Sequence, residues 1–368
     1  MTLTSLPLRH LLPSETPIGL LDADGRLIDG SELTMPSDEV LLDLHRRMVV
    51  GRRFDTQATA LTKQGRLAVY PSSRGQEACE VGAVVALDAQ DWLFPTYRDS
   101  VALVTRGVDP VQTLTLLQGG WHLGYDPYEH RVAPQCTPLA TNTLHAVGVA
   151  HAARYKGEDS VALVLLGDGA TSEGDTHEAL NFAGVWQTPT VFLVQNNGYA
   201  ISVPMSKQNA APSLAHKGIG YGIPSLLIDG NDPAAVYSAV RQAVETARAG
   251  GGPTLIEAVT YRIEAHTNAD DASRYRDSAE VAAWLGRDPL DRLEAYLIGR
   301  GLLDDARREA VAAEAEDFAA SVRKGMNADV VSTVVRPQAL FDHVYAERTA
   351  ALREQAAMLE AELSGEEA

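Results

Sequence analysis

Short apolar runs alternate with helical stretches along most of the chain. Val161–Leu166 and Thr190–Val194 are mainly apolar runs of strand length, and the stretch between them, about Thr176–Trp186, has helical character. The same alternation predicts further strands at Asp91–Phe94, Ser225–Asp229 and Pro253–Tyr261. It predicts helices from Ser37 through Arg52 and beyond, and at Gly75–Leu87, Leu139–Tyr155 and Asp232–Gly250. Because strands and helices alternate in this way, we expect an α/β fold with a doubly wound, mostly parallel sheet.

The two ends of the chain do not share this alternation. Residues 1–37 are rich in Pro, Gly, Asp and Leu without a sustained period, so we expect an extended arm with one small hairpin around Asp24-Gly25-Arg26. From Ser278 onward the pattern predicts amphipathic helices at Glu280–Gly301, Asp304–Met326 and Phe341–Glu362. The expected regions are an N-terminal extended arm at 1–37, an α/β domain at 38–300 and a C-terminal helical region at 301–368.

Composition narrows the class of protein further. The 368 residues are ample for a large core, and no apolar stretch reaches the length that crosses a membrane. A net charge of −18 argues against a nucleic-acid surface, and residues 1–15 lack the pattern of a signal peptide, so we expect a cytoplasmic protein. Cys79 and Cys136 have no CxxC spacing, so we expect two free buried thiols and neither a disulfide nor a zinc site.

Two polar motifs follow neighbouring strands of the predicted sheet. Gly167-Asp168-Gly169 ends the first strand, and Asn196-Asn197 ends the second after an intervening stretch of 26 residues, 170–195. Because the carboxyl ends of parallel strands lie at one edge, Asp168 and Asn197 can converge there, and their oxygens suit Mg²⁺. The glycines allow close approach of a ligand, and the next helix presents its N-terminus to a diphosphate. Each motif alone is an ordinary turn; at this spacing the pair is typical of a site for thiamine diphosphate (ThDP).

Longer motifs carry a resemblance to a known family. They are Gly75-Gln76-Glu77-Ala78, Tyr97-Arg98-Asp99, Gly167-Asp168-Gly169-Ala170, Gln195–Ser202, and Thr260-Tyr261-Arg262 followed by Ala265-His266-Thr267. With these motifs the chain resembles, from about residue 40 to 350, the alpha subunit of the ThDP-dependent decarboxylating component of 2-oxo acid dehydrogenase complexes. Within the branched-chain 2-oxo acid and pyruvate dehydrogenase family it looks most similar to the branched-chain 2-oxo acid and actinobacterial-type subunits, on stretches such as Gly220–Pro224 and Ala269–Arg276.

The resemblance implies how the chain would hold the cofactor. Asp168, the Asn197 side chain and the Tyr199 carbonyl would hold Mg²⁺ against the diphosphate of ThDP. Tyr97 and Arg98 would contact the diphosphate, and a guanidinium suits that task because its planar fork matches phosphate oxygens. The other implied cofactor-binding positions are Leu139, Gly167, Gly169, Ala170 and His266.

The resemblance also implies catalytic residues and a second ion. His266 is implied beside the reacting centre, and Glu77 matches an acid near the entrance of the active site. Residues 137–142 match a segment that binds potassium in branched-chain members, and the implied K⁺ ligands are Cys136, Pro138, Thr141 and Asn142. A further hypothesis is that the polar loop 268–276 orders over the cofactor channel when ThDP binds.

The chain departs from the family pattern at several of these positions. Branched-chain members often carry Ser-Ser-Pro and Gln where this chain has Cys136-Thr137-Pro138 and Asn142, which bears on the potassium site. Gln195 stands where some relatives have an arginine for the diphosphate. Thr267 stands where the mammalian phosphorylation loop has a serine, so a regulatory kinase is not implied.

The resemblance implies an incomplete active site and therefore partners. The glutamate that activates ThDP comes from a separate beta subunit in this family, so we expect two alpha and two beta chains, with a lipoyl acyltransferase component accepting the acyl group from a small 2-oxo acid. Pyruvate and acetoin dehydrogenase subunits, and a ThDP-binding regulatory subunit without activity, remain alternatives. A single-chain ThDP enzyme would need a longer chain. A nicotinamide-dependent dehydrogenase is disfavoured because Gly218–Gly222 neither follows a strand nor has the GxGxxG spacing.

Overall fold

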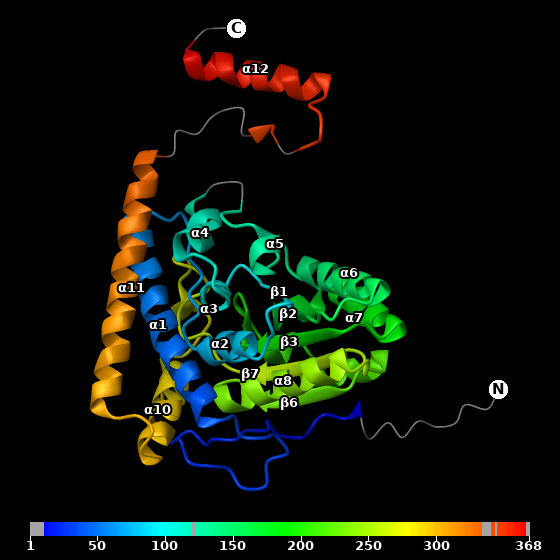
Figure 1. The fold of residues 1–368 in the computed structure, drawn as a ribbon, viewed down its shortest axis with the longest axis vertical. Helices are drawn as coiled ribbons and strands as arrows, with labels where there is room; N and C mark the ends of the chain where they lie inside the picture. The colour runs from blue at the N-terminus through cyan, green and yellow to red at the C-terminus, as the bar shows by residue number, and fades with distance from the viewer. Residues whose placement is uncertain (1–10, 120–122, 333–339, 343, 366–368) are drawn as a thin grey trace, which may run out of the picture. The chain divides into compact units, whose positions relative to one another are not determined.

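The computed structural model describes residues 11–119, 123–332, 340–342 and 344–365 (Figure 1). The chain divides into two compact units, residues 1–323 and 324–368, and each is described by itself. The first unit contains the sheet and the site that follows below. Within the described ranges, no helix is long and apolar enough to cross a membrane.

A parallel five-stranded sheet forms the centre of the first unit. Its strands are β1 (Trp92–Phe94), β2 (Ala162–Gly167), β3 (Thr190–Asn196), β6 (Ser225–Asp229) and β7 (Thr254–Val259). Their order across the sheet is β1-β2-β3-β7-β6, and every neighbouring pair is parallel. All five predicted strands are confirmed: Ser225–Asp229 matches at both ends, and no end of the others differs by more than two residues. The α/β fold with a parallel sheet is confirmed as well.

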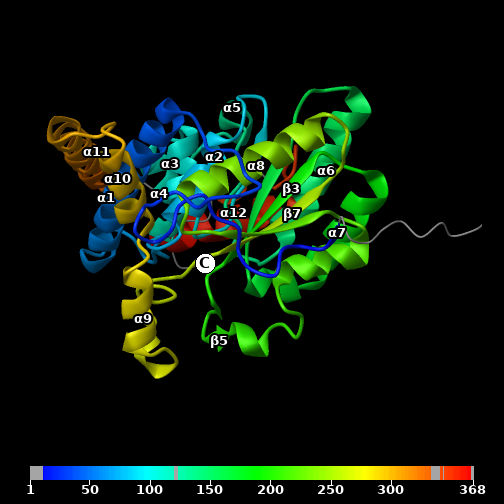
Figure 2. The same cartoon turned by 90° about the horizontal axis from the view of Figure 1, so that it is seen from below.

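Helices cover both faces of this sheet (Figure 2). Helices α6 (Thr141–Lys156) and α7 (Gly174–Trp186) pack on one face, where their alanines meet alternate strand residues such as Val164 and Phe192. Helix α8 (Pro233–Arg248) contacts β3, β6 and β7, and it also contacts α2 (Glu77–Val85). Because both faces are covered, the strands are continuous apolar runs rather than alternating ones.

The order of the strands determines where a ligand can bind. The chain passes from β1 to β2 to β3 through α6 and α7, then moves to the edge strand β6 and returns through α8 to β7. The chain therefore adds strands in one direction across the sheet up to β3 and in the opposite direction from β6 to β7, and β3 and β7 are neighbours where the direction reverses. In open α/β sheets, ligands bind outside the carboxyl ends of the strands at such a reversal. Asp168, Asn197 and Thr260 follow those ends of β2, β3 and β7.

The described residues form further helices and short segments besides this framework. The other helices are α1 (Asp38–Lys63), α3 (Ser100–Arg106), α4 (Pro110–Leu114), α5 (Pro127–His130), α9 (Ser278–Leu285), α10 (Pro289–Gly299), α11 (Asp305–Ser332) and α12 (Ala350–Ser364). Short 3-10 segments are Thr115–Gln118, Gly169–Ser172, Met205–Lys207, Leu214–Tyr221 and Ala272–Arg274, and β4 (Tyr199–Ala200) pairs with β5 (Val203–Pro204). Helix α1 begins as predicted, since the Ser37 side chain accepts from the Val40 N–H at 3.3 Å.

Two of the predicted C-terminal helices were wrong in extent. The single helix expected at Glu280–Gly301 is two helices, because Asp288 caps a new start by accepting from the Leu290 N–H at 2.8 Å, with Pro289 in the first turn. The helix expected from Phe341 begins only at Ala350, where the Thr349 side chain caps it by accepting from the Leu352 N–H. In both cases a local capping residue outweighs the amphipathic pattern.

Of the predicted N-terminal arm, residues 1–10 lie outside the described residues, and residues 11–37 hold the predicted hairpin. The Asp22 N–H donates to the Arg26 carbonyl at 2.8 Å, which closes the turn around Asp24-Gly25-Arg26. Ile18 pairs with the edge strand β6 through the Leu227 carbonyl at 2.9 Å. Both cysteines are free, but only Cys79 is buried. The prediction of burial was wrong for Cys136, because it lies in the partly exposed loop before α6.

Candidate active site

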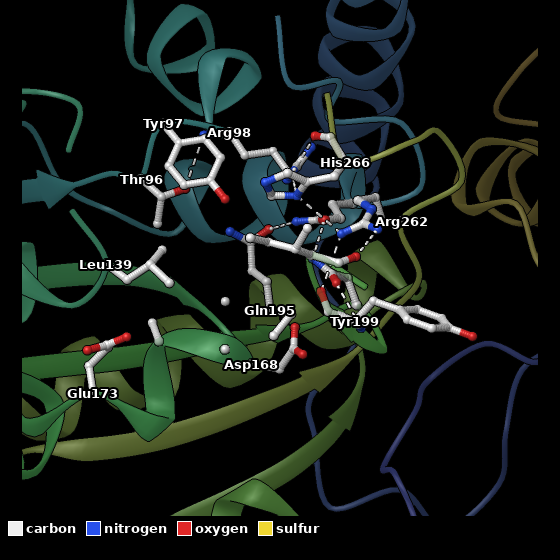
Figure 3. Close-up of a pocket in the computed structure, with 17 residues that line it drawn as sticks. Thr96, Tyr97, Arg98, Leu139, Asp168, Glu173, Gln195, Tyr199, Arg262 and His266 are labelled. Atoms are coloured by element: carbon white, nitrogen blue, oxygen red, sulfur yellow. Dashed lines mark hydrogen bonds between the residues drawn. The ribbon is translucent and has the colours of Figure 1, made fainter. Parts of the chain in front are cut away.

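A cavity of about 200 Å³ opens at the carboxyl edge of the sheet (Figure 3). Its lining comes from the ends of β2, β3 and β7, from the loop after β1 and from the start of α2. The lining residues are Gln76, Thr96, Tyr97, Arg98, Leu139, Gly167, Asp168, Gly169, Ala170, Glu173, Gln195, Asn197, Tyr199, Ala200, Ile201, Arg262 and His266. The structure thus brings together in one cavity every residue predicted to bind the cofactor or Mg²⁺.

Asp168 lies where β2 passes into α7. Its side chain is almost fully buried and accepts from the Gln208 Nε2 at 2.6 Å. Burial raises the pKa of this carboxyl, while the bond from Gln208 opposes the rise. A Cβ on the neighbouring Gly169 would come within 2.7 Å of the Ala200 Cβ, so the loop needs glycine there to pack against β4. A buried carboxylate without a cation beside it is costly, which makes this position receptive to a metal ion.

Three oxygen atoms converge beside Asp168. The Asn197 Oδ1 accepts from the Tyr199 N–H at 3.3 Å and lies 3.2 Å from the Asp168 Oδ1 and 3.1 Å from the Tyr199 carbonyl oxygen. Carboxylate, amide and carbonyl oxygens are the ligands that Mg²⁺ prefers, with water or phosphate oxygens completing its octahedron. No group of three His, Cys, Asp or Glu side chains suited to a metal occurs among the described residues.

Two buried guanidinium groups face the same cavity. Arg98 donates to the carbonyls of Ser72 at 3.0 Å and His266 at 2.9 Å. Arg262 donates to the carbonyls of Tyr199 at 3.3 Å and Ile201 at 2.7 Å. None of these partners is a carboxylate, so the positive charges are not neutralised by them. Figure 3 shows Arg98 and Arg262 on either side of His266, across the cavity from Leu139 and Glu173. An anion such as a diphosphate fits this arrangement.

His266 is held as a neutral imidazole. Burial, the largest cause, and the charges of Arg98 and Arg262 together lower its pKa to about 4, while the charge of Asp270 opposes the change. The Arg98 Nη2 lies 3.1 Å from the His266 Nδ1, and a guanidinium can only donate. The Nδ1 therefore accepts, and the ring proton lies on Nε2. His266 can offer an N–H from Nε2 to a ligand without itself carrying a positive charge.

The other predicted site residues do not line the cavity. Glu77 is completely buried in an ion pair with Arg52, its Oε1 accepting from Nε at 2.8 Å, and it does not line the cavity. In the segment predicted to bind potassium, the Cys136 Sγ donates to the Pro138 carbonyl at 3.2 Å. The Asn142 Nδ2 donates to three carbonyls at the ends of β1 and β2, the shortest bond being 2.8 Å to Leu165.

Sequence reasoning missed several residues that line the cavity. Thr96 and Glu173 have no special signal in the sequence, whereas Gln76 and Ile201 lie within the quoted motifs but were given no role. Arg262 had one: it follows β7 closely, just as Asp168 follows β2, so the rule about carboxyl ends of parallel strands would have placed it in the site. Gln195, noted as a departure from the family pattern, also lines the cavity.

The sequence of the chain is similar to those of a known family and of several known proteins. Residues 45–324 match the family described as "Dehydrogenase E1 component". The chain is 48% identical over 327 residues to the 3-methyl-2-oxobutanoate dehydrogenase subunit alpha of Mycobacterium tuberculosis, covering 89% of this chain and 88% of that protein. It is 38% identical to the pyruvate dehydrogenase E1 component subunit alpha of Staphylococcus aureus, covering 85% of each chain. The corresponding Staphylococcus epidermidis protein is 37% identical over 342 residues, 92% of this chain and 91% of that protein.

Proposed function

Because the chain belongs to the dehydrogenase E1 component family, whose members use ThDP, we propose that it is the alpha subunit of a 2-oxo acid dehydrogenase. It would decarboxylate a 2-oxo acid together with a beta subunit and pass the acyl group to a lipoyl domain. The observation that carries this proposal is the meeting of Asp168, Asn197 and Tyr199 oxygens with two buried arginines in one cavity. In such a site the metal ion and the arginines would bind the same diphosphate group.

ThDP supplies an electron sink for the decarboxylation when it is bound. On this proposal Asp168, Asn197 and the Tyr199 carbonyl hold Mg²⁺, and Arg98 and Arg262 bind the diphosphate. Tyr97 contacts the same group, and its ring lies edge-on to that of His266 at 6.1 Å between centroids. The N-terminal end of α7 adds its dipole to the attraction for the anion.

The neutral His266 would act at the mouth of the cavity. Its Nε2–H can donate to a developing negative charge on the substrate, since Nδ1 is occupied by Arg98. A neutral donor of this kind does not compete with the arginines for the diphosphate. We further propose that the activating carboxylate comes from the beta subunit, in line with the alpha-subunit names of the relatives.

Branched-chain 2-oxo acids are the favoured substrates, because the relative named for 3-methyl-2-oxobutanoate shares 48% identity and the one named for pyruvate 38%. The test is co-expression with the beta partner and comparison of kcat/KM for 3-methyl-2-oxobutanoate and pyruvate. These differ by two methyl groups on the reacting side, each worth roughly 10- to 100-fold in a fitted pocket. A preference for pyruvate or acetoin would overturn the substrate assignment.

Binding separates an enzyme subunit from a regulatory one. Calorimetry of ThDP with Mg²⁺ should show tight binding to the assembled protein and a loss of binding in Asp168→Asn. Binding of ThDP without decarboxylation of any 2-oxo acid by the assembled protein would favour a regulatory subunit instead.

A further inference from the structure

Two amide side chains, those of Gln76 and Gln195, connect Asn197 with the buried carboxylate of Asp99. The Asn197 Nδ2 donates to the Gln76 Oε1 at 2.9 Å, and the Gln76 Nε2 donates to the Gln195 Oε1 at 3.0 Å. The Gln195 Nε2 then donates to the Asp99 Oδ1 at 2.7 Å. All four side chains are buried, Asp99 and Gln76 being 0% and 2% exposed. We call Asn197, Gln76, Gln195 and Asp99 the amide relay.

The relay draws on three separate parts of the chain. Gln76 precedes α2, Gln195 and Asn197 lie at the end of β3, and Asp99 precedes α3. Their meeting is therefore a product of the tertiary fold. An amide side chain offers oxygen at one end and nitrogen at the other, so each member could in principle point either way.

Asp99 determines the direction of the whole relay. Its carboxylate accepts hydrogen bonds: the Thr96 N–H and hydroxyl donate to Oδ2 at 2.6 and 2.7 Å. Gln195 must therefore turn its nitrogen to Asp99 and its oxygen to Gln76. Gln76 must then present nitrogen to Gln195 and oxygen to Asn197. Asn197 in turn must give its nitrogen to Gln76, which leaves its Oδ1 facing Asp168 and the Tyr199 carbonyl.

In this direction the Asn197 Oδ1 lies 3.2 Å from the Asp168 Oδ1 and 3.1 Å from the Tyr199 carbonyl oxygen, with no hydrogen between these oxygens. The Tyr199 N–H donates to the same Asn197 Oδ1 at 3.3 Å. The opposite direction would place an NH₂ group there, which could donate to both oxygens and close the position to a cation. We propose that Asp99 is a positioning residue that, through Gln195 and Gln76, holds Asn197 in the orientation that binds the metal. The inference rests on the proposed function, because it concerns the metal of the same site.

The main test is Asp99→Asn in the full chain loaded with ThDP. Asparagine has the same shape, can still accept from Thr96 and can turn its NH₂ toward Gln195, which permits the relay to reverse. Substitution of outer partners of metal ligands typically weakens metal binding 10- to 100-fold, and we expect about tenfold weaker Mg²⁺ binding by calorimetry. The matched control is Glu80→Gln, which neutralises a buried carboxyl whose Oε2 accepts from the Ala102 N–H outside the relay. Its Mg²⁺ affinity should not change.

A rescue experiment shows whether Asp99 acts through the direction of the hydrogen bonds in the amide relay or through its negative charge. Gln76→Glu moves an acceptor to the next member of the relay, so in the Asp99→Asn background it should restore the orientation of Asn197 and most of the Mg²⁺ affinity. In the otherwise unchanged chain, Gln76→Glu instead places a carboxylate against the Gln195 oxygen. The relay therefore predicts strong favourable coupling between the two substitutions. Additive effects would mean that only local charge matters and would overturn the proposal.

The outcomes distinguish this inference from the proposed function. Failure of the unsubstituted protein to bind Mg²⁺ with ThDP would overturn the proposed function. If the unsubstituted protein binds Mg²⁺ and Asp99→Asn binds it with the same affinity, the relay is overturned but the proposed function is not. The same holds if Glu80→Gln loses as much Mg²⁺ affinity as Asp99→Asn. Circular dichroism checks folding, and Gln195→Met serves as a second variant if Asp99→Asn does not fold. It interrupts the relay and should also weaken Mg²⁺ binding, by roughly 10-fold.

Discussion

At the scale of single residues, burial controls what the polar groups of the cavity can do. Arg98 and Arg262 are buried with carbonyl oxygens as partners, so their charge is left for a ligand. Burial and these two charges also keep His266 neutral. Asp270 supports the same histidine by accepting from its backbone N–H at 2.8 Å. The positive charge of the cavity therefore comes from Arg98 and Arg262, and the neutral His266 can still donate a hydrogen bond.

His266 should titrate far below the ordinary range of histidine. We expect NMR of the ring in the chain without ligand to show a pKa of about 4, against about 6.5 in an unfolded chain. Between these values the unfolded state binds the proton and the folded state does not. The histidine thus contributes stability above pH 6.5 that is lost as pH falls toward about 4.

The substitution Arg98→Leu tests whether the arginine charges help to lower the pKa of His266. Removing one guanidinium should raise the pKa of His266 toward its ordinary value, without restoring it fully because burial, the larger cause, remains. A pKa near 6.5 in the unsubstituted chain would contradict the assignment of a neutral imidazole at the cavity.

At the scale of elements, close helix packing positions the segment that carries Arg98 and Asp99. Helix α3 begins directly after these residues and contacts α1. At the contact, a Cβ built on Gly51 would lie 2.6 Å from the Val101 Cγ1, so the two helices approach as closely as glycine permits. Gly148 in α6 differs, because a Cβ there meets nothing within 4 Å.

These two glycines form a matched pair for a stability test. Gly51→Ala should destabilise the chain by about 1–3 kcal/mol through overpacking, whereas Gly148→Ala should stabilise it by up to about 1 kcal/mol through helix propensity. Denaturant unfolding of the chain by itself measures both. Equal effects of the two substitutions would show that the contact between α1 and α3 is not tightly packed. ThDP affinity should fall only for Gly51→Ala, because α3 would shift.

At the scale of the whole molecule, the chain carries the metal and diphosphate half of the proposed site. The relatives are named as alpha subunits, which implies a beta partner. We expect co-expressed chains to form an assembly of two alpha and two beta subunits, measured by native mass spectrometry. The alpha chain by itself should show little decarboxylation with an artificial electron acceptor. Full turnover by the isolated chain would contradict the proposed division of the active site.

Much of this protein was predictable from local pattern. The apolar runs before Asp168 and Asn197 predicted two strands, and the parallel arrangement predicted that both residues share one edge of the sheet. By contrast, the break between α9 and α10 at Asp288 escaped the periodicity, because a single capping residue decides it. Glu77 has a plausible position in the sequence, yet its ion pair with Arg52, 25 positions away, turns it from the cavity.

The sequence by itself determined the strands, the cofactor motif and the family, because each depends on residues close together along the chain or on their spacing. Only the tertiary structure decided which polar groups face one another. Arg262 lines the same cavity as Arg98 and His266. Asn197 is connected to Asp99 through the side chains of Gln76 and Gln195. Strand order and helix packing bring these residues together from parts of the chain that no local pattern connects. These contacts determine the direction of the hydrogen bonds in the amide relay, and therefore whether Asn197 presents its oxygen to a cation.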